Sequence, residues 1–217
     1  MKHYNYIIFD LDGTLTDSGP GVMNAVTYAL ERFGAEVPDR QALRAFVGPP
    51  LRESFQRFCG FSPERAAEAI EVFREYYGPT GIFENSVYPG MEAALSDLKA
   101  AGRTLAVATT KLDESAYRVL DYFGLSSYFD AVAGSRADGT FSEKAEVLEC
   151  VLARLGADAG DTLMVGDRKY DVEGAAENGV ACMGVLYGYG SREELERAGA
   201  ICLAETPADI ARLILAE

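Results

Sequence analysis

The pattern of apolar and polar residues changes twice along this chain and predicts three segments. Residues 4–9 form an apolar run of strand length that stops at two aspartates, Asp10 and Asp12, followed by Gly13. From about residue 87, short apolar runs alternate with stretches that carry apolar residues at helical spacing. We expect strands at 104–108, 131–133, 162–165, 181–185 and 201–203, and helices at 91–101, 114–123, 143–155, after 170 and at 207–215.

The block between these segments, about 21–77, has the pattern of helices throughout. Its first helix is indicated by apolar residues at helical spacing: Val22, Ala25, Val26, Ala29, Leu30 and Phe33. Asp39 is a candidate N-cap for a short helix that ends near Phe46, before a Gly-Pro-Pro break at 48–50. Ser62 followed by Pro63 is a cap with a proline at the first helical position, and it predicts a further helix at 64–77.

Strands that alternate with helices predict a parallel, doubly wound sheet, an α/β Rossmann-like core. The helical block separates the first strand from the other strands. We therefore expect one α/β core at 1–15 and 86–217, with an inserted all-helical cap at 16–85.

Charge narrows the choice of partners. The chain of 217 residues has a formal net charge of −14, which repels nucleic-acid backbones at long range. We expect no nucleic-acid partner, and a site for a phosphorylated ligand must then carry its own local positive charge. No opening apolar stretch has the length of a signal peptide or a membrane span, so no membrane partner is expected. The oligomeric state stays open.

The histidine and cysteine content limits which catalytic mechanisms and metal sites are possible. His3 is the only histidine and precedes the first strand, so histidine relays and histidine-rich zinc sites are not expected deep in the fold. The four cysteines are scattered without a C-x-x-C pair, which favours reduced thiols in a cytoplasmic protein. Any catalysis must then depend on carboxylates, hydroxyls and lysines, with or without a hard cation.

Polar residues follow several of the predicted strands. Ligands of open parallel sheets bind outside the carboxyl ends of the strands, so these residues are expected at one edge. Each also has a structural explanation: a turn for Asp10 and Asp12, a helix cap for Thr109 or Thr110, a position in a loop for Asp167, and dipole compensation for Asp171. The candidates are Asp10, Asp12, Thr109, Thr110, Asp167 and Asp171.

Lys144 stands out because it falls in a first helical turn if Thr140 or Ser142 is the cap. A cation there opposes the helix dipole, so we expect an anion bound at the helix start to offset the cost. In the helical block, Arg52 is the arginine considered for substrate binding, because it follows the Gly-Pro-Pro break. The glycine-rich stretch 184–190 lacks a P-loop lysine and a dinucleotide fingerprint, and it is interpreted as a mobile loop.

Taken together, these motifs resemble the four signature motifs of the haloacid dehalogenase superfamily. They are Asp10-Leu-Asp12-Gly-Thr, the strand-end Thr109, the helix-start Lys144, and Gly-Asp167 with Asp171 four residues later. The helical insertion is similar to the small cap of that superfamily, and 17–21 and 46–51 resemble its phosphoglycolate phosphatase-like branch. Asp12 argues for phosphoryl chemistry, because true dehalogenases lack this second aspartate. Thr110 departs from the asparagine that is common in this branch.

The resemblance implies an Mg²⁺-dependent phosphatase that acts on a small phosphorylated metabolite. Asp10 would be the nucleophile that forms an aspartyl-phosphate. Asp12 would be the general acid and then the general base, and its backbone carbonyl would contact the metal. Asp10 and Asp167 would hold Mg²⁺, and Asp171 would orient the metal's waters or Lys144.

The remaining implied roles concern the substrate. Thr109 and Lys144 would bind the phosphoryl group, with Thr110 beside them, and closure of the cap would bring Arg52 or its neighbours to the leaving group. Phosphoglycolate, a nucleoside monophosphate and a sugar phosphate all stay open as substrates. A phosphosugar mutase and a non-enzymatic phosphoacceptor signalling module are the alternative functions.

Overall fold

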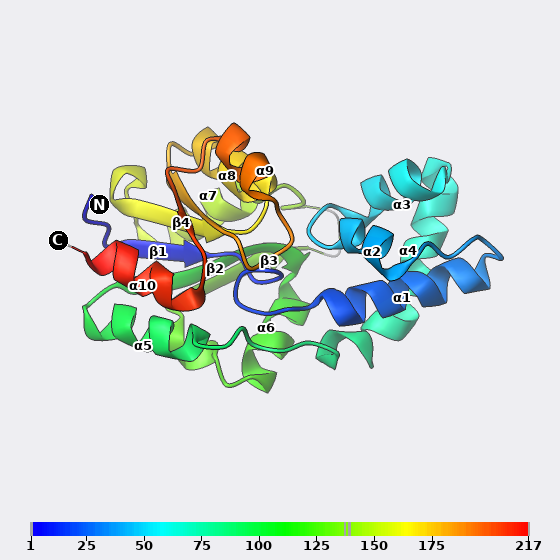
Figure 1. Ribbon diagram of the computed structural model, residues 1–217, viewed down its shortest axis with the longest axis horizontal. Coiled ribbons are helices and arrows are strands. Elements are labelled where there is room, and N and C mark those ends of the chain that lie inside the picture. The colour runs from blue at the N-terminus through cyan, green and yellow to red at the C-terminus, as the bar shows by residue number, and fades with distance from the viewer. Residues whose placement is uncertain (1, 137, 139, 217) are drawn as a thin grey trace. The chain divides into compact units, whose positions relative to one another are not determined.

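The computed structural model describes residues 2–136, 138 and 140–216, and the chain divides into two compact units (Figure 1). One unit comprises residues 1–16 and 87–217, and the other comprises residues 17–86. Each division lies one residue beyond the boundary expected from the sequence. Among the described residues, no helix has both the length and the apolar character needed to cross a membrane.

The larger unit is built on a six-stranded parallel sheet in the order β3-β2-β1-β4-β5-β6. The central strand β1 pairs Ile7 with Leu105 of β2 on one side and with Leu163 of β4 on the other. This arrangement confirms the predicted α/β doubly wound sheet. The strands are β1 (Tyr6–Phe9), β2 (Thr104–Leu112), β3 (Ala131–Ser135), β4 (Thr162–Gly166), β5 (Ala181–Val185) and β6 (Cys202–Ala204).

Helices cover both faces of this sheet, with α7, α8 and α9 on one face and α5, α6 and α10 on the other (Figure 1). Ile8 of β1 contributes to the core beneath α7 and α8, which also contains Val147 and Val172. The helices are α5 (Met91–Ala100), α6 (Asp113–Tyr122), α7 (Lys144–Leu155), α8 (Lys169–Glu177), α9 (Arg192–Ala198) and α10 (Pro207–Leu215), with 3-10 turns η3 (Ser126–Tyr128) and η4 (Ala159–Asp161).

The second strand differs most from its sequence prediction. It continues to Leu112 instead of ending at Ala108, and its register with β3 shifts between Ala108 and Leu112. The helix that follows begins at Asp113 with Leu112 as its N-cap, so Thr110 is not the helix cap that the sequence allowed. The cause is a bulge, which adds residues to one strand and re-aims their side chains.

The smaller unit consists of helices. They are α1 (Gly19–Arg32), α2 (Arg40–Leu43), η1 (Arg44–Phe46), α3 (Leu51–Cys59), α4 (Pro63–Tyr77) and η2 (Gly81–Phe83). Asp39 and Ser62 cap α2 and α4 through their side chains, as the sequence predicted. Gly21 lies so close to η2 that a Cβ there would be 1.8 Å from the Gly81 carbonyl oxygen, so only glycine fits.

Candidate active site

Asp10 is the first residue after β1, and its backbone N–H continues the sheet by donating to the Val165 carbonyl at 2.9 Å. Its side chain is buried, with 7% of the residue exposed. Burial raises the pKa of Asp10 to about 6, with Lys144 opposing the shift and Asp171 and Asp12 adding to it. The strand therefore places a carboxylate in a buried site.

Asp167 follows the neighbouring strand β4 and is fully buried. Its Oδ2 accepts a hydrogen bond from the Tyr189 backbone N–H at 2.7 Å. Its Oδ1 has no hydrogen-bond partner within the part of the chain that the structure describes. Burial and the charges of Asp171 and Asp10 raise the pKa of Asp167 well above its usual range. An orphaned buried carboxylate oxygen is costly unless a ligand or cation completes it.

Asp171 lies in the first turn of α8, where its Oδ2 accepts from the Arg168 backbone N–H at 3.0 Å. Asp10, Asp167 and Asp171 each offer a carboxylate oxygen, and these oxygens lie within 4.8 Å of one another. Hard divalent cations such as Mg²⁺ prefer this kind of oxygen donor. The buried cluster and the orphaned Asp167 oxygen therefore fit a metal site.

Lys144 is the first residue of α7, and its ammonium group is buried among these acids. Its Nζ lies 2.6 Å from Asp10 Oδ1 and 2.8 Å from Asp171 Oδ1, and it donates to the Ala108 carbonyl at 3.0 Å. Burial alone would lower its pKa, but the charges of Asp10 and Asp171 outweigh burial and raise the pKa of Lys144. Two carboxylates thus lie beside Lys144 at the start of α7, whose cap is Glu143 and not Thr140 or Ser142. Binding of a ligand anion at this helix start stays a prediction.

The close approach of α8 to α7 depends on Gly174. A Cβ on this residue would lie 2.9 Å from both Cβ and Cγ of Lys144. Glycine at this position leaves the space through which the Lys144 side chain runs toward the acids.

The Asp12 side chain pairs with a different lysine from the one that pairs with Asp10 and Asp171. Lys111 Nζ donates to both carboxylate oxygens of Asp12, at 2.7 Å and 3.0 Å. Lys111 was visible in the sequence at the end of a predicted strand, but it received no role there. The sequence places Lys111 near the edge where Asp12 was expected, but the bulge that aims its side chain at Asp12 leaves no signal in the local sequence.

The other predicted residues differ in their surroundings. Thr109 is buried at the edge of the sheet, where its Oγ1 accepts from the Lys111 backbone N–H at 3.2 Å. Thr110 is half-buried in the bulge of β2. Arg52 is exposed in α3 of the helical unit, so its contact with substrate stays a prediction.

The stretch 184–190, interpreted from the sequence as a mobile loop, begins inside β5 (Ala181–Val185), and its residues 187–190 pack against Asp167. The Tyr187 hydroxyl donates to the Thr14 carbonyl at 2.9 Å, and the Tyr189 N–H binds Asp167 as described above. A Cβ on Gly188 would lie 2.4 Å from both Asp167 Cβ and the Gly13 carbonyl oxygen. The glycines serve close packing around an acid of the site, which glycine content alone could not distinguish from flexibility.

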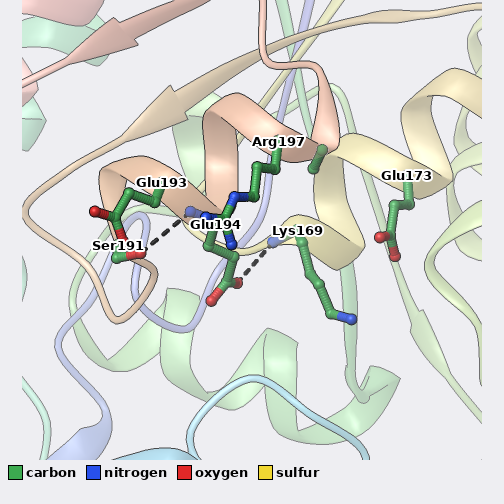
Figure 2. A pocket seen from close by; sticks show the side chains of 7 residues that line it. Lys169, Glu173, Ser191, Glu193, Glu194 and Arg197 are labelled. Carbon is green, nitrogen blue, oxygen red and sulfur yellow. Dashed lines mark hydrogen bonds between the residues drawn. The ribbon is translucent and has the colours of Figure 1, made fainter.

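A separate hollow is lined by residues of α8 and α9, including Lys169, Glu173 and Arg197 (Figure 2). Within it, Glu194 accepts from the Lys169 backbone N–H at 3.0 Å and from Arg168 Nε at 2.8 Å. Glu194 thereby holds the start of α8, directly after Asp167. None of the three clustered acids lines this hollow.

Residues 7–185 match the family model described as haloacid dehalogenase-like hydrolase. The chain belongs to this family. The predicted family, fold and enzyme class are thereby confirmed.

Three relatives show how close the likeness is. A 5'-nucleotidase of Pseudomonas aeruginosa is 44% identical over 192 residues, which are 88% of this chain and 87% of the relative. Tyrosine-protein kinase PtkA of Mycobacterium tuberculosis is 41% identical over 88% of this chain, which spans 65% of the kinase's length. The crystal structure of a predicted phosphatase from Clostridium acetobutylicum superposes with a TM-score of 0.95 at 44% identity, covering 99% of each chain.

Proposed function

We propose that this protein is an Mg²⁺-dependent phosphatase that hydrolyses a small phosphomonoester through an aspartyl-phosphate on Asp10. The observation that carries the proposal is the buried cluster of Asp10, Asp167 and Asp171 with Lys144 among them. Family membership supports the phosphatase class, and the cluster supports the cation.

The electrostatics of the site explain why a cation is needed. A carboxylate that approaches a phosphate dianion to about 4 Å meets a repulsion of about 8 kcal/mol at an effective dielectric constant of about 20. Lys144 supplies one positive charge, but its ammonium already neutralises part of Asp10 and Asp171. Mg²⁺ held by Asp10 and Asp167, together with the Asp12 carbonyl, would supply the remaining positive charge and polarise the phosphoryl oxygens.

The proposed reaction uses the chain's own residues in two steps. An Asp10 oxygen attacks phosphorus, the bond from phosphorus to the ester oxygen breaks, and Asp12 donates a proton to the departing oxygen. Asp12 then takes a proton from water as that water attacks the phosphorus of the aspartyl-phosphate, which returns the Asp10 carboxylate and releases phosphate. Thr109, with Thr110 beside it, and Lys144 would hold the phosphoryl oxygens, and Asp171 keeps the Lys144 ammonium in place.

For the substrate, we propose a small phosphomonoester such as a nucleoside monophosphate, phosphoglycolate or a sugar phosphate. The relative named 5'-nucleotidase supports the first of these. The helical unit, residues 17–86, would act as the cap that excludes bulk water and brings Arg52 or its neighbours to the leaving group. A cytoplasmic location is part of the same proposal.

The test is release of inorganic phosphate from p-nitrophenyl phosphate with Mg²⁺, under conditions of many turnovers. Asp10→Asn is expected to abolish turnover and to keep the fold, whereas the matched exposed variant Asp97→Asn keeps full activity. Appreciable turnover by Asp10→Asn would refute the nucleophile. A single stoichiometric burst from the unmodified protein would favour the phosphoacceptor module. Return of the phosphoryl group to another sugar hydroxyl would favour the mutase, and its transfer to a tyrosine would place the chain with the relative named as a kinase.

A further inference from the structure

Lys111 is a buried lysine that the proposed reaction does not use. Its side chain is 6% exposed, and that of its partner Asp12 is 18% exposed. Lysine is rarely buried unless it is paired, because its charge loses hydration. In this protein the partner is the carboxylate assigned to proton transfer, 99 residues away in the sequence.

The fold places Lys111 at Asp12 through the bulge of β2. Ala108 pairs with Ala133 and Leu112 pairs with Ser135, so four steps along β2 match two steps along β3. The Lys111 backbone is held in this bulge by its N–H bond to Thr109 Oγ1. Bulges of this kind re-aim side chains beside active sites.

A glycine on the neighbouring strand makes the bulge possible. A Cβ on Gly134 would lie 2.5 Å from the Lys111 carbonyl oxygen and 2.7 Å from the Asp113 backbone. The Gly134 N–H also donates to Asp113 Oδ1 at 2.9 Å, which ties the end of the bulge to β3. The position of the Lys111 side chain is therefore specified by backbone packing.

The two lysines with buried side chains pair with different acids of the site. Lys144 binds Asp10 and Asp171, whereas Lys111 binds both oxygens of Asp12. A carboxylate with both oxygens held by one cation has one favoured orientation, because rotation would break a charge-assisted hydrogen bond. When one Asp12 oxygen carries the proton, the other oxygen still accepts from Lys111.

We infer that Lys111 is a positioning residue that holds the Asp12 carboxyl in the orientation for proton transfer to the leaving oxygen. This inference rests on the proposed phosphatase function and deepens it. We therefore expect loss of Lys111 to lower kcat/KM most for substrates whose leaving group must be protonated. The phenolate of 2,4-dinitrophenyl phosphate is a weak base and leaves without a proton. The unsubstituted phenolate of phenyl phosphate is a stronger base, so its departure depends on protonation.

The experiment measures kcat/KM for phenyl phosphate, p-nitrophenyl phosphate and 2,4-dinitrophenyl phosphate in Lys111→Met and in the unmodified protein. General acid catalysis contributes about 10²- to 10⁴-fold, so loss of its orientation is expected to lower kcat/KM for phenyl phosphate by about 10- to 100-fold. For 2,4-dinitrophenyl phosphate we expect a change under about 3-fold, because the acid is not needed. Lys99→Met, which removes a lysine from a surface pair with Asp130, is the matched control and is expected to change neither value.

A double-mutant cycle with Asp12→Asn supplies a second readout. If Lys111 acts through Asp12, Lys111→Met is expected to have no further effect on kcat/KM for phenyl phosphate once Asp12 is replaced. Lys111→Gln keeps a polar side chain of similar length, and it is the variant to use if the methionine protein does not fold. It is also expected to steepen the dependence on leaving group, because an uncharged amide binds a carboxylate more weakly than an ammonium does.

The outcomes separate the possibilities. An equal loss for all three esters means that Lys111 binds the substrate itself and overturns the inference, as does unchanged kcat/KM for phenyl phosphate in a folded variant. Full additivity in the double-mutant cycle overturns it as well. If the unmodified protein releases phosphate from none of the esters, the proposed function is overturned and this inference with it. If the unmodified protein is active but the variants show the same dependence of kcat/KM on the leaving group, this inference alone is overturned.

Discussion

Replacement of Lys144 by methionine tests whether the acids of the site depend on this buried cation. Lys144→Met keeps an unbranched side chain of similar length but removes the ammonium that lies 2.6 Å from Asp10 and 2.8 Å from Asp171. The variant therefore leaves three carboxylates within 4.8 Å of one another without a compensating charge from Lys144.

The size of the effect follows from these distances. At 4.8 Å, two like charges repel by about 3.5 kcal/mol at an effective dielectric constant of about 20. The attraction lost with Lys144 is about 4 kcal/mol for each of its two partners at a charge separation of about 4 Å. Part of this loss is offset because the ammonium no longer has to be desolvated. We expect a net loss of about 3–5 kcal/mol in the free energy of unfolding, the range for removal of one partner of a buried ion pair.

The assay is urea denaturation of the metal-free protein, followed by circular dichroism at pH 7.5 in the presence of a chelator. The matched control is again Lys99→Met, whose pair with Asp130 is partly exposed and is expected to contribute at most about 1 kcal/mol. A Lys144→Met protein as stable as Lys99→Met at pH 7.5 would refute the reasoning.

The same variant has an expected dependence on pH. Burial already raises the pKa of Asp10 to about 6, and loss of the Lys144 charge raises this pKa further. A carboxyl whose pKa is higher in the folded state than in the unfolded chain destabilises the fold above that pKa, and the penalty shrinks as the pH falls through it toward the unfolded-state pKa of about 4. The deficit of Lys144→Met relative to the unmodified protein is therefore expected to shrink between pH 7.5 and pH 5. A constant deficit over this range would argue that lost packing, and not charge, is the cause.

Two further predictions concern Asp167. Addition of Mg²⁺ at 100 times its dissociation constant is expected to stabilise the unmodified protein by about 2.7 kcal/mol. Asp167→Asn is expected to lose this gain, whereas the surface control Asp97→Asn keeps it. Thermal unfolding with and without the metal measures the difference. Equal Mg²⁺-dependent shifts in both variants would argue against Asp167 as a ligand. Gly188→Ala is expected to lower stability by about 1–3 kcal/mol and to weaken Mg²⁺ binding, because its Cβ would lie 2.4 Å from Asp167 Cβ. Gly160→Ala is the control, since the only atom within 4 Å of a Cβ there is Lys2 Nζ, at 3.7 Å. Unaltered Mg²⁺ affinity in Gly188→Ala would show that segment 187–190 does not hold Asp167.

Much of the core and of the acid cluster could be predicted from the sequence. The alternation of apolar runs and helical repeats reports local backbone preference and burial, and parallel strands bring their carboxyl ends to one edge. For this reason the sequence predicts that Asp10 and Asp167, which directly follow strands that pair with each other, lie together. Lys144 was found by a related argument, since a cation in a first helical turn needs a nearby anion.

Other features were decided only by the tertiary structure. The bulge of β2 and the contact between Lys111 and Asp12 depend on register and on a glycine of β3, none of which leaves a periodic signal in the local sequence. Segment 187–190 has the composition of a flexible loop, yet its glycines allow its backbone to pack against Asp167. Local pattern specifies which elements form and where they end, whereas contacts between residues far apart in the chain depend on how those elements pack, because many distant partners are compatible with the same local pattern.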